Sequence, residues 1–411
     1  MKFYQITPLI LLFCFVFLQC KKSEKPTDDS TKPPVVATGS VPTVLTTDVL
    51  NITTITARSG GSTTSNGGSS ITERGIVVGL TTNPTISDTK FGTVSVNGGG
   101  EFVSEITGLK ANTKYFLRAF AVNKSGTGYG NEITFTTTAI GNASFNVTPL
   151  FIVGATVAAA DIEVTNDGGD AITERGLVYG LAENPTITDT KVKHGANGTG
   201  KYRLTMKELL PKTSYHVRAY AVNAKGVSYS NDVTFKTIAK GNITYTFNKS
   251  ANPSSSELEA YARLQIAIDS ATWYLTNFTS ATKHVWLNYV DGVPTADANN
   301  EGWMRFGTNS GFQNIRTMLH EMNHTFGTGT STWWNSKIVG GKFQGQHTND
   351  LLQKIQKSAT AVQLSGDTQH WWPYGLNQNS EVTSSWDYVY NAILMEAMRK
   401  DGQAHSGPYT P

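Results

Sequence analysis

Three residues in the C-terminal third of the chain have the types and spacing of a metal site. His320, Glu321 and His324 form an H-E-x-x-H pattern within the stretch "TMLHEMNHTFGTGTS". On a helix, residues four apart project from the same face, so both imidazoles can hold one zinc ion. Glu321 can take a proton from a zinc-bound water and later give it to a leaving amine. The pattern therefore predicts a zinc site at which water attacks a peptide bond.

A zinc site that performs catalysis normally takes three protein ligands and leaves the fourth position for water, so the motif needs one more ligand. His370, His347 and Glu381 all carry ligand types that zinc accepts. His370 is our first choice, because it follows a polar turn and begins the aromatic run "HWWPY" in a loop that could cross beneath the metal. The sequence leaves all three open, and it predicts one zinc ion per chain.

The residues around these candidates also have purely structural interpretations. His347 could lie on a surface turn before a helix, and Glu381 could occupy the first turn of the last helix, where negative charge is favoured. Trp371 and Trp372 are of a type that usually packs in a core. Tyr374 could donate a hydrogen bond to a developing oxyanion, but such a tyrosine is more often a core residue.

The sequence around the motif predicts the elements that position it. Apolar residues at steps of three or four predict an amphipathic helix over residues 258–278 and a second over residues 310–326, which carries the motif. Between them, "KHVWLNYV" and "WMRFGT" predict strands, separated by the loop "DGVPTADANNEG". We therefore expect an α+β domain over residues 238–411.

This order of helix, strand, loop, strand and helix, with "HEMNHTFG" on the second helix, resembles the zincin metallopeptidases. In that superfamily an edge strand beside the active-site helix binds an extended peptide, and the resemblance makes Gly302–Gly307 the strand that we expect in this role. Gly327 is similar to the turn that ends the helix in the metzincin subgroup, but Thr330 stands where that subgroup has a third histidine. "HWWPYGLNQNSE" resembles a segment of secreted bacterial zincin-like domains. The resemblance implies a peptide or protein substrate.

A repeated sequence unit precedes this domain. Residues 71–90, "ITERGIVVGLTTNPTISDTK", recur as residues 172–191, "ITERGLVYGLAENPTITDTK", and residues 109–137 recur as residues 209–237. Each copy contains short β-rich runs separated by clusters of Gly, Asn, Asp and Pro, which is typical of an antiparallel sandwich. The chain is therefore expected to be a multidomain protein with two all-β modules followed by the α+β domain.

The two modules, residues 41–137 and 138–237, resemble immunoglobulin-like and fibronectin type III sandwiches at one corner. The residues that carry the resemblance are Leu109, Thr113 and Tyr115 in the first copy and Leu209, Thr213 and Tyr215 in the second. In fibronectin type III domains this tyrosine hydroxyl bonds back to the backbone at the corner. The "ITERG" segment is similar to a variant found in surface proteins of the Bacteroidetes. Two interpretations stay open: the modules are spacers, or their loops bind a glycan or a host protein.

The N-terminal segment has the features of an export signal. Residues 1–20 contain an apolar run that is too short to span a bilayer. They end in "FLQC", which resembles the lipobox of bacterial lipoproteins except for Gln19, and the resemblance implies that Cys20 is acylated. Residues 21–40 are Pro-rich and charged, which predicts a disordered tether. We expect an exported protein that is lipid-anchored to the outer membrane or cell surface; a plain secretory signal is the alternative.

Composition limits the remaining function classes. A net charge of +3 over 411 residues gives no reason to expect a nucleic-acid partner. Both cysteines, Cys14 and Cys20, lie in the N-terminal segment, so no disulfide is expected in the folded domains. The leading hypothesis is a surface-anchored zinc metallopeptidase with Glu321 as general base. The alternatives are an adhesin or glycan-binding surface protein with a structural or inactive C-terminal domain, and a scaffold in which His320 and His324 are core residues.

Overall fold

The computed structural model describes residues 39–92, 99–407 and 409. The chain divides into two compact units. The first unit consists of Met1–Asp48, Gly60–Ser104 and Leu117–Ile133. The second unit consists of Val49–Ser59, Glu105–Phe116 and Thr134–Pro411. The predicted signal peptide with Cys20, and the predicted tether up to residue 38, lie outside the described residues. No helix in the described part of the chain combines the length and the apolar character needed to cross a membrane.

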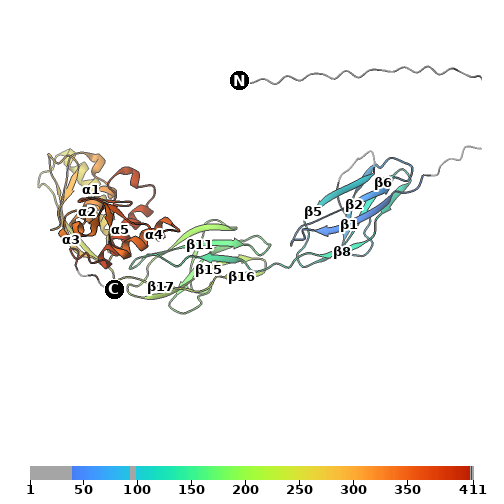
Figure 1. Ribbon diagram of the computed structural model, residues 1–411, viewed down its shortest axis with the longest axis horizontal. Helices are drawn as coiled ribbons and strands as arrows, with labels where there is room; N and C mark the ends of the chain where they lie inside the picture. Colours follow the sequence, from blue (N-terminus) through green and yellow to red (C-terminus); the bar gives the residue numbers. More distant parts are fainter. Residues whose placement is uncertain (1–38, 93–98, 408, 410–411) are drawn as a thin grey trace, which may run out of the picture. The chain divides into compact units, whose positions relative to one another are not determined.

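Each copy of the repeated unit folds into two β-sheets (Figure 1). In the first copy, one sheet contains, in order, β1 (Thr43–Leu50), β2 (Ala57–Ser65) and β5 (Gly100–Ile106). The other sheet contains, in order, β4 (Thr89–Phe91), β3 (Glu73–Gly79), β6 (Lys114–Asn123) and β7 (Gly126–Tyr129), and β8 (Ile133–Thr136) pairs with β6. Along β5, buried and exposed side chains alternate, as expected for a strand with one face on a core.

The second copy repeats this arrangement with antiparallel pairs. One sheet contains β9 (Ser144–Val147), β10 (Ile152–Val153), β11 (Ala158–Asn166) and β14 (Gly200–Met206). The other contains β13 (Thr190–Lys193), β12 (Glu174–Gly180), β15 (Ser214–Asn223), β16 (Gly226–Tyr229) and β17 (Val233–Lys236). Apolar side chains from both sheets, among them Ile162, Leu177 and Val217, form one buried core. The prediction of β-sandwich sheets for the repeated units is confirmed.

The corner tyrosine of each copy makes the expected hydrogen bond. The backbone N–H of Lys110 donates to Tyr115 Oη at 2.9 Å, and the backbone N–H of Leu210 donates to Tyr215 Oη at 2.9 Å. Both tyrosines are buried, so the bond provides a partner for a hydroxyl that water does not reach freely.

The C-terminal region is built around a mixed four-stranded sheet. β18 (Asn242–Asn248), β19 (Thr282–Tyr289) and β21 (Trp303–Phe306) run parallel, and β20 (Ala296–Ala298) lies antiparallel beside β21 at the edge. Because parallel neighbours need a crossover connection, helix α1 (Ser255–Phe278) links β18 to β19. A capping box between Ser254 and Glu257 fixes the start of α1.

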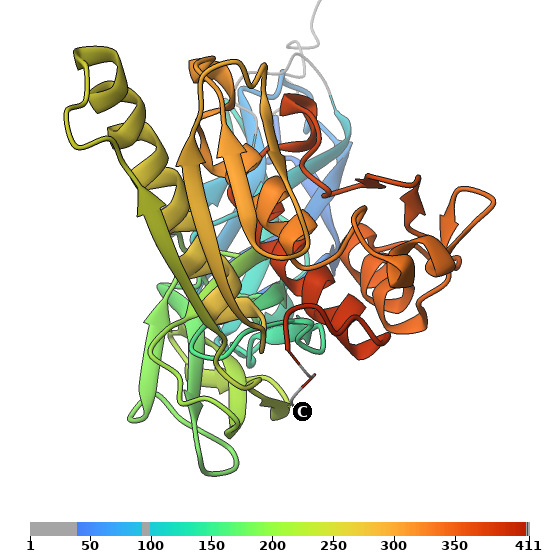
Figure 2. The same cartoon turned by 90° about the vertical axis from the view of Figure 1, so that its left-hand side faces the viewer.

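Further helices and a second small sheet complete this region. The helices are α2 (Ile315–Thr325), α3 (Thr332–Lys337), α4 (Gln346–Gln356) and α5 (Trp386–Lys400), with 3-10 turns η1 (Ser310–Phe312) and η2 (Asn379–Glu381). The small antiparallel sheet contains β22 (Ile338–Val339), β23 (Lys342–Phe343), β24 (Ser365–Gly366) and β25 (Trp371–Trp372). Helix α1 contacts α2 and α5, and Figure 2 shows α1 beside the four-stranded sheet. The motif helix α2 is thus held between α1 and β20.

Two expectations about this region are wrong. The helix that carries the motif begins at Ile315 rather than at residue 310, because Oδ1 of Asn314 accepts a hydrogen bond from the backbone N–H of Thr317 at 3.1 Å and caps the helix there. Gly302–Gly307 is not the edge strand, because β20 lies outside β21 in the sheet. The edge is formed instead by the three residues of β20, from the segment that was expected to be a loop.

The second β copy shares a hydrophobic core with the C-terminal region. Ile152 and Ala159 are buried in the same cluster as Phe278 of α1. At the corresponding positions of the repeat, the first copy has Asn51 and Arg58, and the Arg58 side chain is 48% exposed. This face of the second copy is therefore specialised for contact with the C-terminal region, and the first copy has polar residues at these two positions.

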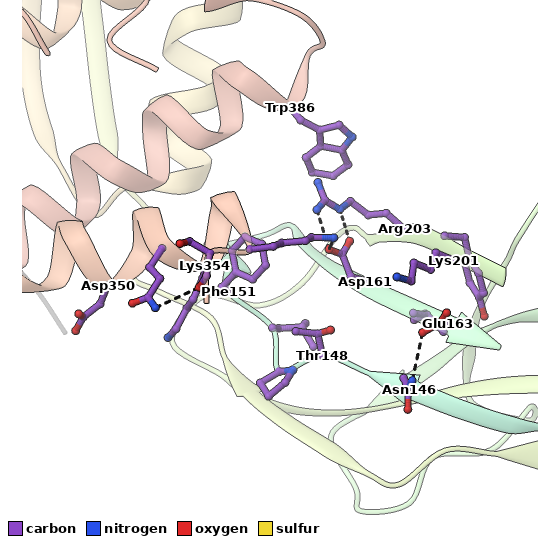
Figure 3. Close-up of a pocket in the computed structure, with 17 residues that line it drawn as sticks. Asn146, Thr148, Phe151, Asp161, Glu163, Lys201, Arg203, Asp350, Lys354 and Trp386 are labelled. Carbon is purple, nitrogen blue, oxygen red and sulfur yellow. Dashed lines mark hydrogen bonds and ion pairs between the residues drawn. The ribbon is translucent and has the colours of Figure 1, made fainter. Parts of the chain in front are cut away.

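Charged and aromatic groups border this junction (Figure 3). Arg203 Nε lies 2.5 Å from an oxygen of Asp161, and the Arg203 guanidinium lies 4.6 Å from the centre of the Trp386 ring in α5. Lys357 of the C-terminal region also pairs with Asp161 at 3.2 Å. The cleft that these residues line has a volume of about 1120 Å³. The second copy and the C-terminal region are thus joined by both apolar and ionic contacts.

Candidate metal centre

Three of the residues named from the sequence come together at one point. His320 and His324 project from α2, and His370 lies in the turn between β24 and β25. One ring nitrogen of each histidine lies within 4.8 Å of the others. The Nε2 atoms of His320 and His324 are 3.2 Å apart. Two nitrogens that bind one tetrahedral zinc ion at about 2.0 to 2.1 Å are separated by about 3.4 Å, so the donor set fits this metal.

The other nitrogens of the α2 histidines are held by backbone carbonyls. His320 Nδ1 lies 2.8 Å from the carbonyl oxygen of Gly375, and His324 Nδ1 lies 2.8 Å from that of Thr328. A carbonyl oxygen can only accept, so each Nδ1 carries the proton and each Nε2 presents a lone pair. Metal-binding histidines commonly have such a hydrogen bond on the second ring nitrogen.

Burial keeps these two imidazoles neutral. Burial, together with the neighbouring His324, lowers the pKa of His320 to about 3. The pKa of His324 is also lowered, mainly by burial. Zinc binds the unprotonated imidazole, so both side chains are in the ligand form at neutral pH.

Glu321 lies beside the histidines with an unpaired carboxylate oxygen. Its side chain lines the same cavity, of about 390 Å³, and its Oε2 has no hydrogen-bond partner among the described residues. Burial, with a further contribution from Asp297, raises the pKa of Glu321 to about 8, and the positive charge of Arg316 opposes this shift. The cavity therefore contains a buried carboxyl group that can exchange a proton near neutral pH.

Glycine makes room for the third histidine. Gly329 has φ of +70°, and a Cβ there would lie 2.0 Å from the carbonyl oxygen of Gln369, the residue before His370. The loop after α2 can therefore lie directly against the turn that carries His370. Thr330, which occupies the position of a third histidine in metzincins, instead donates its hydroxyl hydrogen bond to the carbonyl of His324 at 2.6 Å.

The alternative third ligands lie elsewhere. His347 is in the first turn of α4, where its backbone N–H donates to the Asp401 carboxylate at 3.0 Å. Glu381 is in η2, and its Oε2 accepts hydrogen bonds from the Asn377 side chain and from a backbone N–H, both at 3.0 Å. Neither belongs to the group of three histidines.

Tyr374, considered as an oxyanion stabiliser, does not line the cavity around the histidines. Its ring packs edge-on against Tyr390, with ring centres 5.2 Å apart, and its carbonyl oxygen accepts a hydrogen bond from the Asn391 side chain at 2.8 Å. Tyr374 therefore packs against α5 and anchors its own loop there, and it does not lie beside the three histidines.

Sequence reasoning missed several residues that line the cavity. Arg316, Asp297 and Asn377 are among them. Arg316 lies four residues before His320 on the same helix, so helical spacing could have pointed to it. Asp297 lies in the segment expected to be a loop, and Asn377 reaches the cavity only through tertiary folding.

The exposed edge of β20 also faces this cavity, which Ala296 and Ala298 line. The backbone N–H of Gly307 donates to the carbonyl of Thr295, and that of Asn299 donates to the carbonyl of Trp303. In an antiparallel pair, alternate residues direct their backbone groups to the neighbouring strand. The N–H and C=O groups of Ala296 and Ala298 therefore point away from β21, toward the free edge.

No protein-family model matches the chain, and no curated protein matches it. Among solved structures, the sensor domain of the anti-sigma factor RsgI4 of Pseudobacteroides cellulosolvens is similar at 20% identity over 24% of this chain and 97% of that chain, with a TM-score of 0.21. The FN1–FN3 domains of chicken CNTN1 are similar at 16% identity over 49% of this chain and 69% of that chain, with a TM-score of 0.22. Similarities of this size carry no argument about the metal centre.

Proposed function

We propose that residues 238–411 form a zincin-like metallopeptidase domain in which His320, His324 and His370 hold one zinc ion and Glu321 acts as general base. The observation that carries this proposal is the arrangement of the two α2 imidazoles. Their Nε2 atoms face each other at 3.2 Å while both Nδ1 atoms are bound to carbonyl oxygens. A cation between the two lone pairs accounts for this arrangement, and a hydrogen bond does not.

The side chains around the site have the groups that peptide hydrolysis needs. When bound, zinc would supply a Lewis acid and a water that is nucleophilic near neutral pH. The unpaired Oε2 of Glu321 can accept the proton that this water loses. Glu321 can then return the proton to the leaving amine nitrogen, so that one water is consumed and one carboxyl and one amine are formed for each bond broken.

The free edge of β20 gives the proposed substrate a place to bind. An extended peptide can pair with the outward N–H and C=O groups of Ala296 and Ala298, as in other cases of strand addition. Backbone pairing does not depend on the substrate's side chains, so it suits a peptide or protein substrate in an extended conformation. Backbone pairing by itself does not define which substrate sequence is preferred.

We also propose an exported protein, lipid-anchored through Cys20 to the outer membrane or cell surface and carried on the tether of residues 21–40. The motif and composition of the N-terminal segment support this setting. Binding of a glycan or a host surface protein by the loops of the β modules is a further proposal, for which the test is retention of target binding by residues 41–237.

The test of the catalytic proposal uses residues 21–411 and their Glu321→Gln variant. Zinc content and hydrolysis of a fluorescently labelled denatured protein are measured for both, with Glu259→Gln on the exposed side of α1 as the matched control. The proposal expects one zinc per chain in all three proteins and loss of hydrolysis in Glu321→Gln alone. Unchanged hydrolysis by Glu321→Gln would remove the assigned base. Zinc binding without hydrolysis by the parent protein would favour the adhesin alternative.

A further inference from the structure

Arg316 is a buried cation whose hydrogen-bond partners are all neutral among the described residues. The residue is 7% exposed. Nη1 donates to the carbonyl oxygens of Leu376 at 2.8 Å and Asn377 at 3.1 Å, and Nη2 donates to Thr317 Oγ1 at 2.9 Å. The nearby carboxylates of Glu381 and Glu321 offset part of the cost of burying this charge, although neither is a hydrogen-bond partner of the guanidinium. Its hydrogen bonds beyond α2 all go to the loop that contains Leu376 and Asn377.

The contacts lie directly beside the metal centre. Arg316 precedes His320 by one turn of α2, so the two side chains share a helix face. His320 Nδ1 binds the carbonyl of Gly375, and Arg316 binds the next two carbonyls, those of Leu376 and Asn377. One face of α2 thus holds three consecutive carbonyl groups of a single loop.

Two residues of this loop have backbone conformations that need support from their surroundings. Tyr374 and Leu376, on either side of Gly375, have φ values of +71° and +61°. Non-glycine residues adopt such values at a cost and keep them where the surroundings hold them. The side chain of Asn377 also donates to the carbonyl of Trp371 at 2.8 Å, which closes the loop back to the residue after His370. The loop therefore connects the carbonyl that orients one ligand with the turn that carries another.

We propose that Arg316 is a positioning residue of the metal centre. Its guanidinium fixes the carbonyls of Leu376 and Asn377, which directs the carbonyl of Gly375 at His320 Nδ1. This hydrogen bond sets the tautomer and the rotation of the His320 ring, so that Nε2 faces His324 and His370. The inference rests on the proposed zinc site, and it adds a residue whose effect on the metal passes through a loop and not through direct contact.

The test compares Arg316→Met, Arg316→Gln and Arg316→Lys in residues 21–411. Zinc affinity is measured by competition with a chromophoric chelator, and ligand geometry by the visible absorption of the cobalt-substituted protein. Loss of an outer-shell contact commonly weakens metal binding by about 10- to 100-fold, and we expect this range for Met and Gln, with a changed cobalt spectrum. Lys, which keeps the charge and can reach one carbonyl, is expected to recover part of the affinity.

Arg263→Met is the control, because Arg263 donates to Gln313 Oε1 at 2.8 Å and pairs with Glu259 at 3.8 Å, and neither partner belongs to the loop. The control is expected to keep the parent zinc affinity and cobalt spectrum. Parent-like affinity and spectrum in folded Arg316→Met would overturn the proposal. If that variant does not fold, Arg316→Gln decides by the same criterion.

A failure of the zinc site itself can be told apart from a failure of this inference. If the parent protein binds no zinc, the proposed function is wrong, and the role of Arg316 is read from histidine side-chain ¹⁵N spectra of the metal-free protein. The positioning role predicts an Nδ1-protonated His320 in the parent protein and loss of that single tautomer in Arg316→Met. The same tautomer in both proteins would contradict this role.

Discussion

The Nε2 atoms of His320 and His324 lie 3.2 Å apart, and in each ring the opposite nitrogen lies 2.8 Å from a backbone carbonyl oxygen. The carbonyls fix the protons on Nδ1, so the two facing nitrogens both present lone pairs. Two lone pairs at this distance repel each other in the absence of a cation. The face of α2 that carries the two histidines is therefore preorganised to receive a positive ion, which is the physical basis of the proposed zinc site.

The third ligand can be identified by substitution. His370→Ala should reduce the zinc content of the purified protein below one per chain, because only two imidazoles would remain and a two-ligand site binds zinc weakly. His347→Ala and Glu381→Gln should retain full zinc content, because those side chains lie outside the group of three histidines. Elemental analysis of the three variants measures this. Retention of tight zinc binding by His370→Ala would contradict the assignment.

Stability of the metal-free protein should depend on the protonation of the two α2 histidines. The pKa of His320 is depressed from 6.5 to about 3 in the folded protein, and that of His324 is lowered as well, so the unfolded chain binds more protons at acidic pH. The free energy of unfolding should therefore fall as the pH decreases from 6.5 toward 3. Denaturant unfolding across this range measures it. The double variant His320→Gln, His324→Gln should show a flatter profile, and an unchanged slope would count against the depressed pKa values.

A glycine at position 329 should be required for stability and for zinc binding, because the backbone there lies against the turn that carries His370. Gly329→Ala adds a Cβ about 2.0 Å from the carbonyl oxygen of Gln369 at a φ of +70°. Gly340 has a similar φ of +58° but no atom within 4 Å of an added Cβ, so Gly340→Ala isolates the backbone strain, which costs about 1 kcal/mol. Gly329→Ala is expected to cost more than this and to weaken zinc binding. Equal effects of the two substitutions on thermal stability and zinc affinity would contradict the expectation.

The second β copy should be necessary for the stability of the C-terminal region. Ala159→Arg introduces the residue of the first copy and forces a charge into the shared core, so we expect a loss of more than about 3 kcal/mol in the free energy of unfolding. The reciprocal change, Arg58→Ala in the first copy, affects a half-exposed side chain and should alter stability by less than about 0.5 kcal/mol. Chemical denaturation of both variants measures this. Comparable small effects would show that the junction is dispensable.

How far the sequence could predict this site depended on the range of the interactions. The spacing of His320, Glu321 and His324 is a local property of a helix, and helix geometry was enough to place them on one surface. His370 lies 46 positions beyond His324, so its approach required the glycine turn and the loop between β24 and β25. Loop composition favours His370 over His347 and Glu381 as the third ligand, but composition does not define a distance.

The wrong expectations also have physical causes. β20 has only three residues, Ala-Asp-Ala, and is shorter than the run of alternating residues that predicts a strand, so its sequence indicates a loop and leaves β21 as the expected edge. The sequence of the second copy alone does not predict the shared core at Ile152 and Ala159, because a strand face that packs on another domain has the same kind of apolar residues as one that packs within its own sheet pair. Both features are set by the packing of distant segments and not by local sequence.

The measurement that tests the proposed metal centre most directly is X-ray absorption at the zinc edge of the zinc-loaded protein, residues 21–411. The proposed site predicts three imidazole nitrogens and one oxygen donor from water, all about 2.0 to 2.1 Å from the metal. Loss of one imidazole from this shell in His370→Ala would identify the third ligand. A shell with fewer than three imidazoles in the parent protein, or failure of the protein to retain zinc, would contradict the proposed metal centre.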